Sequence, residues 1–226
     1  MIERYAAVVC DWSLEVGRGT RLLVDGPLES KPLATAVAAH AWRAGATVSV
    51  NLQPAWSSPV VTAPELAAEL DGAFDAVCEI HHVGRRSTEA AHSPLRRVRC
   101  AWPTDHAAQS EGVGTLRLAE TVFSACLLDQ PDPIAAWRAV AARNERAIAR
   151  LGAASRLSAG GAEFALAGVD WVGEAGRTCL PGAAVTGVLR EGTLVLETRG
   201  SERSALLDGR ALHGPIALDG VEVTAW

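Results

Sequence analysis

The chain has 226 residues, of which 49% are hydrophobic and 21% are charged, and this composition is typical of a globular protein with a full core. Its net charge of -5 argues against general affinity for nucleic acid, which requires a basic surface. No apolar run of about 20 residues could span a bilayer, and the N-terminus lacks a signal-peptide pattern. We therefore expect a cytoplasmic protein without a membrane partner.

Helices and strands are expected to alternate over the first two thirds of the chain. Apolar residues recur every three or four positions over 3–16, which predicts a helix, and 20–24 is a short apolar run typical of a buried strand. A helix over 30–45 and a strand over 47–52 complete a βαβ unit, which implies a parallel strand pair. The alternation continues with strands expected at 74–80 and 96–101, and helices at 63–70, 115–128 and 132–152.

The character of the sequence changes after residue 156. Short apolar stretches separated by glycines predict strands at 163–167, 169–172, 193–197 and 221–223, and Asp208-Gly209 and Asp219-Gly220 are typical of hairpin turns. The sequence therefore predicts an α/β protein, with an N-terminal parallel α/β sandwich over 1–153. A smaller antiparallel β-rich region is expected over 154–226.

Tryptophan and cysteine are the side chains most open to a functional interpretation. Trp12, Trp42 and Trp137 lie on the apolar faces of expected helices, so we expect them in the core. Three further tryptophans lie in proline-flanked or terminal segments, where they are either buried or interface anchors: Trp56, Trp102 and Trp226. The five cysteines form no Cys-x-x-Cys pair and are expected to be small buried hydrophobes.

The segment 176–187 reads Gly-Arg-Thr-Cys-Leu-Pro-Gly-Ala-Ala-Val-Thr-Gly and follows an expected strand and a turn. It resembles the first metal-ligand loop of the M29 metallopeptidases (aminopeptidase T and AmpS-like), in which Arg-Asn-Met/Leu-Pro-x-Gly-Glu-Val supplies a glutamate ligand. Two other stretches resemble that family: Gly-Arg-Gly-Thr-Arg-Leu-Leu-Val at 17–24 and Pro-Asp-Pro-Ile-Ala-Ala-Trp at 131–137.

The resemblance implies an aminopeptidase fold from which the metal chemistry is missing. Ala184 stands at the position of the ligand glutamate, and a methyl group cannot bind a cation. The family's remaining ligands lie in a further C-terminal region, whereas this chain reaches only to Trp226. We therefore expect a truncated, degenerate relative with no metal ligands, no catalytic residues and no cofactor.

These observations predict a non-catalytic protein that binds a peptide or precursor peptide and presents it to a modifying enzyme, for example in ribosomal-peptide natural-product biosynthesis. The basic pair Arg85 and Arg86 is a candidate part of the peptide-binding site, because arginine binds carboxylates with two parallel hydrogen bonds. The other candidate peptide-binding residues surround the resembling loop: Trp171, Arg177, Thr178, Ala184 and Thr186. Because M29 peptidases are commonly dimeric, the resemblance also implies a homodimer.

The alternative interpretation is a metal- or thiol-dependent peptidase or hydrolase with a relocated active site. Its candidate residues are His81, His82, Asp170 and the Cys179 thiol. Neighbouring residues on a strand point to opposite faces, so His81 and His82 would not easily bind one ion together. No histidine is close in sequence to Cys179, which would need a base to lower its pKa. A purely structural subunit is the third interpretation.

Overall fold

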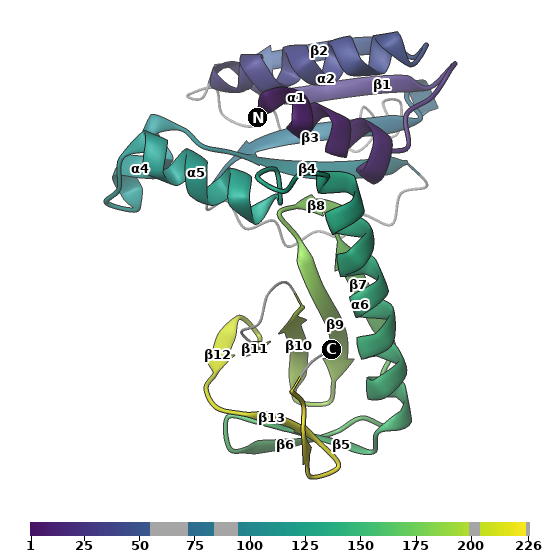
Figure 1. Cartoon of the computed structure of the whole chain (residues 1–226), viewed down its shortest axis with the longest axis vertical. Helices are drawn as coiled ribbons and strands as arrows, with labels where there is room; N and C mark the ends of the chain where they lie inside the picture. Colours follow the sequence, from purple (N-terminus) through teal and green to yellow (C-terminus); the bar gives the residue numbers. More distant parts are fainter. Residues whose placement is uncertain (55–71, 84–94, 199–203, 225–226) are drawn as a thin grey trace. The chain divides into compact units, whose positions relative to one another are not determined.

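The computed structural model describes residues 1–54, 72–83, 95–198 and 204–224 (Figure 1). The chain forms two compact units, one of Met1–Ile134 with Gly176–Pro181 and one of Ala135–Ala175 with Gly182–Trp226. Four sequence predictions lie outside the described residues: the helix at 63–70, the Arg85–Arg86 pair, Trp56 and Trp226. Within the described part, no helix has both the length and the apolar character needed to cross a membrane.

The first unit is built on a parallel sheet of five strands, which confirms the α/β prediction. Its strand order is β2-β1-β3-β4-β8, and every neighbouring pair is parallel. We call it the first sheet. Its strands are β1 (Arg21–Pro27), β2 (Thr47–Gln53), β3 (Ala76–His82), β4 (Arg96–Trp102) and β8 (Cys179–Leu180).

The described helices of this unit include α1 (Ile2–Ala7), α2 (Lys31–Arg43), α4 (Asp105–Ser110) and α5 (Thr115–Ala125). Figure 1 shows α1 and α2 on one side of the sheet. Tyr5 of α1 joins helix and sheet, because its hydroxyl donates to the Ala101 carbonyl at 3.0 Å and its ring lies edge-on to Phe123 of α5. A short 3-10 turn, Leu28–Ser30, connects β1 to α2.

The helix expected over 3–16 changes geometry part-way. After Ala7 the chain forms a π-helix, η1 (Val8–Ser13), and the Leu14 N–H donates to the Val9 carbonyl five residues earlier. Helix α4 was not expected from the sequence, because its six residues carry no helical period. It begins at Thr104, whose hydroxyl accepts a hydrogen bond from the Ala107 N–H at 3.2 Å.

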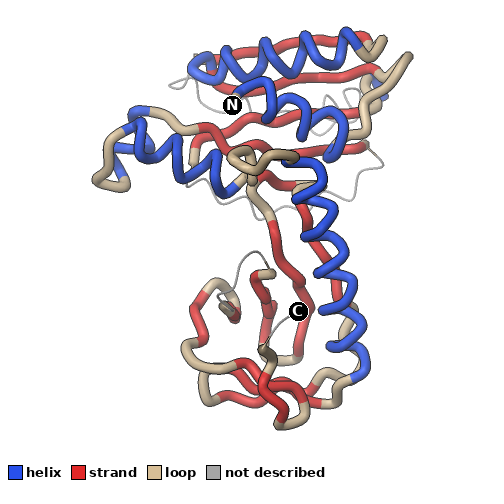
Figure 2. The backbone as a smooth tube through the Cα atoms, viewed as in Figure 1, coloured by secondary structure: helices blue, strands red, loops and turns tan. Residues whose placement is uncertain are grey.

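The second unit contains two antiparallel sheets and most of α6 (Pro133–Ala153), which Figure 2 shows as a long helix. The second sheet has the order β12-β11-β10-β9-β7, and the third has the order β14-β13-β5-β6. The strands of the second sheet are β7 (Trp171–Ala175), β9 (Ala183–Leu189), β10 (Gly192–Glu197), β11 (Ala205–Leu207) and β12 (Arg210–Leu212). Those of the third are β5 (Arg156–Ala159), β6 (Ala162–Ala165), β13 (Ile216–Leu218) and β14 (Val221–Glu222).

The compact units divide the chain elsewhere than after residue 153. Ala147 and Leu151 of α6 belong to the same buried cluster as Leu157 and Leu194, so this part of the helix packs with the antiparallel sheets. Conversely, Gly176–Pro181 belongs to the first unit because β8 pairs with β4. Both assignments depend on packing between residues distant in sequence, which the order of the elements does not show.

The structure corrects one of the predictions about tryptophan. Trp12 and Trp137 are buried as predicted, but Trp42 is 75% exposed, so the prediction of a core position for Trp42 is wrong. Trp102 is buried and its indole N–H donates to the Glu29 carbonyl at 3.1 Å, which favours a core role over an interface role. An alanine-rich helix such as α2 has too weak a period to show which side faces the sheet.

Four of the five cysteines are buried, as predicted: Cys10, Cys78, Cys100 and Cys126. The Cys78 and Cys100 sulfur atoms lie 3.7 Å apart on adjacent strands. Burial raises the pKa of the Cys10 and Cys100 thiols, which disfavours the thiolate form that a nucleophile needs.

Candidate functional site

The segment 176–187 does not form one loop. Its first half enters β8, where the Arg99 N–H donates to the Thr178 carbonyl at 2.9 Å. Its second half opens β9, which lies between β7 and β10 in the second sheet. The structure therefore places Arg177 and Thr178 in the first unit, and Trp171, Ala184 and Thr186 in the second.

Arg177 holds the first half of this segment against η1. Its guanidinium carbon lies 3.8 Å from the ring centroid of Trp12, and Nη1 forms an ion pair with Glu15 at 2.7 Å. The same nitrogen donates to the Trp12 carbonyl, and the Ser13 hydroxyl donates to the carbonyl of Gly176. These contacts hold the partly exposed Arg177 side chain against residues of its own unit, and its role in peptide binding stays a prediction.

The end of η1 explains why arginines gather there. A helix end leaves backbone carbonyls without helical partners, and side-chain donors commonly satisfy them. The Arg96 side chain donates to the Leu14 and Glu15 carbonyls, as Arg177 does to that of Trp12. The two arginines therefore stabilise the C-terminal end of the π-helix.

Strand β9 presents two different faces. Val185, Gly187 and Leu189 are buried, whereas Ala184, Thr186 and Val188 point the other way, as the two-residue period of a strand requires. Trp171 of β7 stands opposite Gly187 and packs against the buried cluster. A Cβ atom at position 187 would lie 2.7 Å from the indole ring, so only glycine fits beneath it.

Trp171 consequently lies on the inner face, away from Ala184 and Thr186. Its indole nitrogen is buried and has no hydrogen-bond partner in the part of the chain that the structure describes. The structure thus brings Ala184 and Thr186 together on one surface but does not bring Trp171 to it. Its role in peptide binding also stays a prediction.

Asn144 of α6 fixes the helix against the inner side of β7. Its side-chain nitrogen donates to the Glu174 carbonyl at 2.7 Å, and its oxygen accepts from the Thr198 hydroxyl. Gly173 allows this approach, because a Cβ there would lie 3.1 Å from the Cβ of Asn144. Since Asn144 is buried and its polar atoms are paired, this contact positions β7 without exposing a polar group to the core.

The opposite side of β7, β9 and β10 forms a surface that we call the outer face. Strand register places Val172, Thr186 and Val195 in one row and Val188 beside Thr193 in another. Val172 is 67% exposed and Val188 is 73% exposed. The residues of the outer face are Val172, Glu174, Ala184, Thr186, Val188, Thr193, Val195 and Glu197.

Ala184 is bracketed by two carboxylates on this face. It stands opposite Glu174 of β7 on one side and Glu197 of β10 on the other. With neighbouring strands about 4.8 Å apart, the backbones of the two glutamates are separated by about 10 Å. Glu197 also accepts a hydrogen bond from the Ser204 hydroxyl at 2.6 Å.

The residues around Ala184 do not fit the two-metal site that the M29 resemblance implies for that family. Such a site needs several carboxylate and imidazole ligands around ions about 3.5–4 Å apart. Across residues 1–54, 72–83, 95–198 and 204–224, no three side chains of His, Cys, Asp or Glu are grouped so that they could hold a metal ion.

The candidate residues of a relocated active site are dispersed. His81 and His82 are consecutive on β3, so their side chains lie on opposite faces of the first sheet. His82 is in register with Trp102 on the helix-covered face, and His81 lies on the other face. Cys179 pairs with Arg99 in the first sheet, and Asp170 precedes β7 in the second unit. The expectation that the two histidines diverge is therefore confirmed.

Comparison with known proteins supports the fold. The chain is similar to the solved structure of wild-type AmpT from Thermus thermophilus, with a TM-score of 0.59 and 18% identity over 96% of this chain and 68% of that chain. The chain has an aminopeptidase-like fold. No protein-family model matches the sequence. No curated protein matches it significantly either.

The sequence did not reveal the outer face because β9 was interpreted as part of a loop. Its signal was present, since Val185, Gly187 and Leu189 alternate with Ala184, Thr186 and Val188. The Pro181-Gly182 pair and the motif that resembles a ligand loop both favour a loop at this position. The glutamates on either side of Ala184 could be identified only from the strand register.

Proposed function

We propose that the protein is a non-catalytic peptide-binding protein built on an aminopeptidase-like fold, and that the outer face of the second sheet receives the peptide. The exposure of Val172 and Val188 beside Thr186 and Val195 is the observation that carries this proposal. Contiguous exposed apolar side chains commonly mark a site of protein interaction. β-Branched side chains are stiff, so they lose little conformational entropy when a ligand covers them.

The charges on this face favour a particular class of peptide. Glu174 and Glu197 lie on either side of Ala184, in the row next to Val172, Thr186 and Val195 at one end of the outer face. A peptide that carries apolar side chains followed by lysine or arginine would complement both features. In this proposal the peptide is the substrate of a separate modifying enzyme, as in ribosomal-peptide biosynthesis, and this chain recognises it without cutting it.

The binding test uses calorimetric titration with peptides of that composition and with matched peptides in which glutamate replaces the basic residue. We expect saturable binding of the basic peptides, and weaker binding when Val188→Asp adds a charge to the outer face at the end away from the glutamates. Val221→Asp is the matched control, because Val221 is 69% exposed on β14 of the third sheet. Equal binding by the two variants would contradict the proposed surface.

A metal-dependent peptidase remains the alternative function, and the two carboxylates beside Ala184 are the observation that favours it. It predicts stoichiometric binding of zinc or cobalt, and metal-dependent release of nitroaniline from aminoacyl nitroanilides. Removal of both activities by Glu174→Gln would support the alternative. Peptide binding that leaves the peptide intact after prolonged incubation with either metal would support recognition without cleavage.

A further inference from the structure

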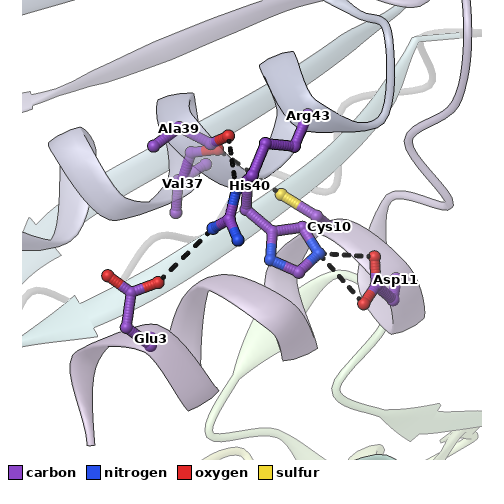
Figure 3. Close-up of polar contacts among 7 residues, drawn as sticks. All are labelled: Glu3, Cys10, Asp11, Val37, Ala39, His40 and Arg43. Atoms are coloured by element: carbon purple, nitrogen blue, oxygen red, sulfur yellow. Dashed lines mark hydrogen bonds and ion pairs between the residues drawn. The ribbon is translucent and has the colours of Figure 1, made fainter.

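Charged side chains of α1, η1 and α2 form pairs in the first unit. Figure 3 shows two of these pairs, in which His40 lies 2.9 Å from Asp11 and Arg43 lies 3.7 Å from Glu3. Pairing is the usual state of ionisable groups in a folded protein, because a charge that is partly removed from water costs free energy unless another group compensates it. A partly buried charge without such a partner is therefore informative.

The face of the first sheet opposite these helices carries a row of polar residues, one on each of four adjacent strands. Strand register places them side by side in the order Asn51, Asp25, Glu79 and Arg99 on β2, β1, β3 and β4. Glu79 is matched, because the Arg97 side chain donates to it. Solvent reaches the row, since Asn51 is exposed and the Glu79 side chain is 29% exposed.

Asp25 has no charged partner among the described residues. The neutral Asn51 amide donates to it at 2.7 Å, and burial raises the pKa of the Asp25 carboxyl. A carboxylate that is partly buried without a counter-charge lowers the stability of the fold at neutral pH. Proteins commonly keep such unfavourable charges where they bind a ligand.

Arg99 is the opposite case, on the far side of Glu79. Its backbone N–H donates to the Thr178 carbonyl, but in the part of the chain that the structure describes its half-buried side chain forms no ion pair or hydrogen bond. Asp25 and Arg99 are two strands apart, so their backbones are separated by about 10 Å. The row thus presents one unmatched negative and one unmatched positive charge within the span of a small molecule.

Strands β1 and β3 are also where the chain changes direction across the sheet. From β1 the chain passes through α2 to β2 on one side, and it then crosses to β3 on the other side of β1. In open parallel sheets ligands bind at such a switch point, toward the carboxyl ends of the strands. Asp25 and Glu79 lie on these two strands, at or beyond the middle of each. The topology and the unmatched charges therefore indicate the same place.

We propose that this row binds a small zwitterion of the amino-acid class. The ammonium group of the ligand donates to Asp25 and to the Asn51 amide oxygen, and its carboxylate accepts two hydrogen bonds from the Arg99 guanidinium. The Glu79–Arg97 pair between them carries no net charge, so it repels neither end of the ligand. This site is separate from the outer face of the second sheet and does not depend on the proposed peptide binding.

Calorimetric titration of the full chain with the standard amino acids tests this proposal. The N-acetyl and amide derivatives of the tightest ligand are the matched compounds, because each lacks one of the two charges. We expect saturable binding of the amino acid, and a dissociation constant higher by about tenfold or more for either derivative. The first derivative removes the partner of Asp25, and the second removes the partner of Arg99.

Two variants assign each charge of the ligand to its residue. Asp25→Asn should weaken binding of the amino acid by about tenfold or more, yet leave the weak binding of the N-acetyl derivative unchanged. Arg99→Gln should weaken the amino acid similarly and leave the amide derivative unaffected, and Arg99→Lys should recover part of the loss. A merely structural role for either residue would not produce this exchange of selectivity.

Asp75→Asn is the matched control. Asp75 is a carboxylate at the opposite end of the same sheet, where it pairs with Arg21 at 2.8 Å, so its loss should leave the affinity for the amino acid unchanged. The proposal is overturned if no standard amino acid binds saturably, if Asp25→Asn binds as the wild type does, or if Asp75→Asn loses as much. Binding of magnesium or calcium in place of an amino acid, abolished by Asp25→Asn, would also overturn it.

Discussion

The face of the first sheet opposite its helices differs from the outer face of the second sheet. On the first sheet, the face opposite the helices carries polar side chains that pair with one another: Asn51 donates to Asp25 at 2.7 Å, and Arg97 donates to Glu79. On the second sheet, the outer face carries exposed valines and two glutamates. The comparison teaches that the first surface pairs several of its polar side chains with one another, whereas the second exposes apolar area to a ligand.

The sharpest way to test this comparison is to truncate one side chain on each face of the second sheet. Leu194 is fully buried on the inner face, next in sequence to Val195 of the outer face. Leu194→Ala should lower the free energy of unfolding by about 2–5 kcal/mol, because it removes buried methyl groups and leaves a cavity. Denaturant unfolding measures the change.

Val188→Ala is the matched truncation on the outer face. Since Val188 is 73% exposed, we expect a change within about 0.5 kcal/mol. A loss as large as that of Leu194→Ala would mean that the outer face is covered in the folded protein. The proposed peptide site would then have to be abandoned.

The next largest effect is expected at Arg177. Arg177→Ala removes the stacking on Trp12, the hydrogen bond to the Trp12 carbonyl and the ion pair with Glu15. We expect a loss of about 1–3 kcal/mol in stability, since a backbone acceptor loses its partner. Thermal unfolding measures the loss, and Arg177→Lys should recover only part of it because lysine lacks the planar fork.

The same variants separate the structural role of Arg177 from peptide recognition. If Arg177 only holds the 176–181 segment, both variants should bind peptide with unchanged affinity while they remain folded. Lost binding without lost stability would instead support the original prediction from sequence. That outcome would also shift the proposed site toward the first unit.

Introducing a carboxylate at position 184 is expected to change stability by less, and by an amount that depends on pH. Ala184→Glu would place three glutamates in one cross-strand row, with Glu174 and Glu197 as neighbours. Like charges directly opposite each other each cost roughly 0.2–1 kcal/mol at neutral pH, and they raise the pKa of the new carboxyl. The variant should therefore recover stability as the pH falls, which thermal unfolding across pH measures.

Divalent cations test whether the row of carboxylates in Ala184→Glu can bind a metal ion. If the row of carboxylates has the geometry of a metal site, zinc or cobalt should raise the melting temperature of Ala184→Glu more than that of the wild type. An Ala184→Gln variant, which lacks the added charge, is the control. Equal responses of the three proteins to the metal would show that the position does not act as a ligand site in this fold.

Much of the first unit could be predicted from sequence because its signals are local. The apolar runs of β1, β3 and β4 and the proline-initiated helix α2 each show their type within a dozen residues. In the second unit, the Asp208-Gly209 turn likewise has positive φ at both residues, as expected of a hairpin. The parallel sheet follows from the βαβ order. These elements needed no knowledge of distant contacts.

The outer face could not be predicted, because it depends on register between strands. Glu174, Ala184 and Glu197 are separated by 10 and 13 positions in the sequence and meet only through the pairing of β7, β9 and β10. The exposure of Trp42 likewise depends on the pairing of His40 and Arg43 with residues of the first helices. A sequence pattern shows residue type and period, but it does not show which side of a helix or strand packs against another element.

The smallest expected effect concerns Asp25, on the face of the first sheet opposite the helices. Burial raises the pKa of the Asp25 carboxyl, and the hydrogen bond from Asn51 offsets only part of that shift. A raised pKa in the folded state means that ionised Asp25 reduces stability at neutral pH, and that this cost disappears as the pH falls below the unfolded-state value of about 4. Asp25→Asn should therefore be more stable than the wild type at neutral pH, and the difference should shrink toward pH 4.

Asp75 gives the opposite sign on the same sheet and serves as the control. Hydrogen bonds from Arg21 lower the pKa of Asp75 to about 2, so its contribution is present at neutral pH and is lost as the pH falls from about 4 through about 2. Asp75→Asn should be less stable than the wild type at neutral pH and converge with it in acid. If both variants shifted stability in the same direction, the opposite environments of the two carboxyl groups would be contradicted.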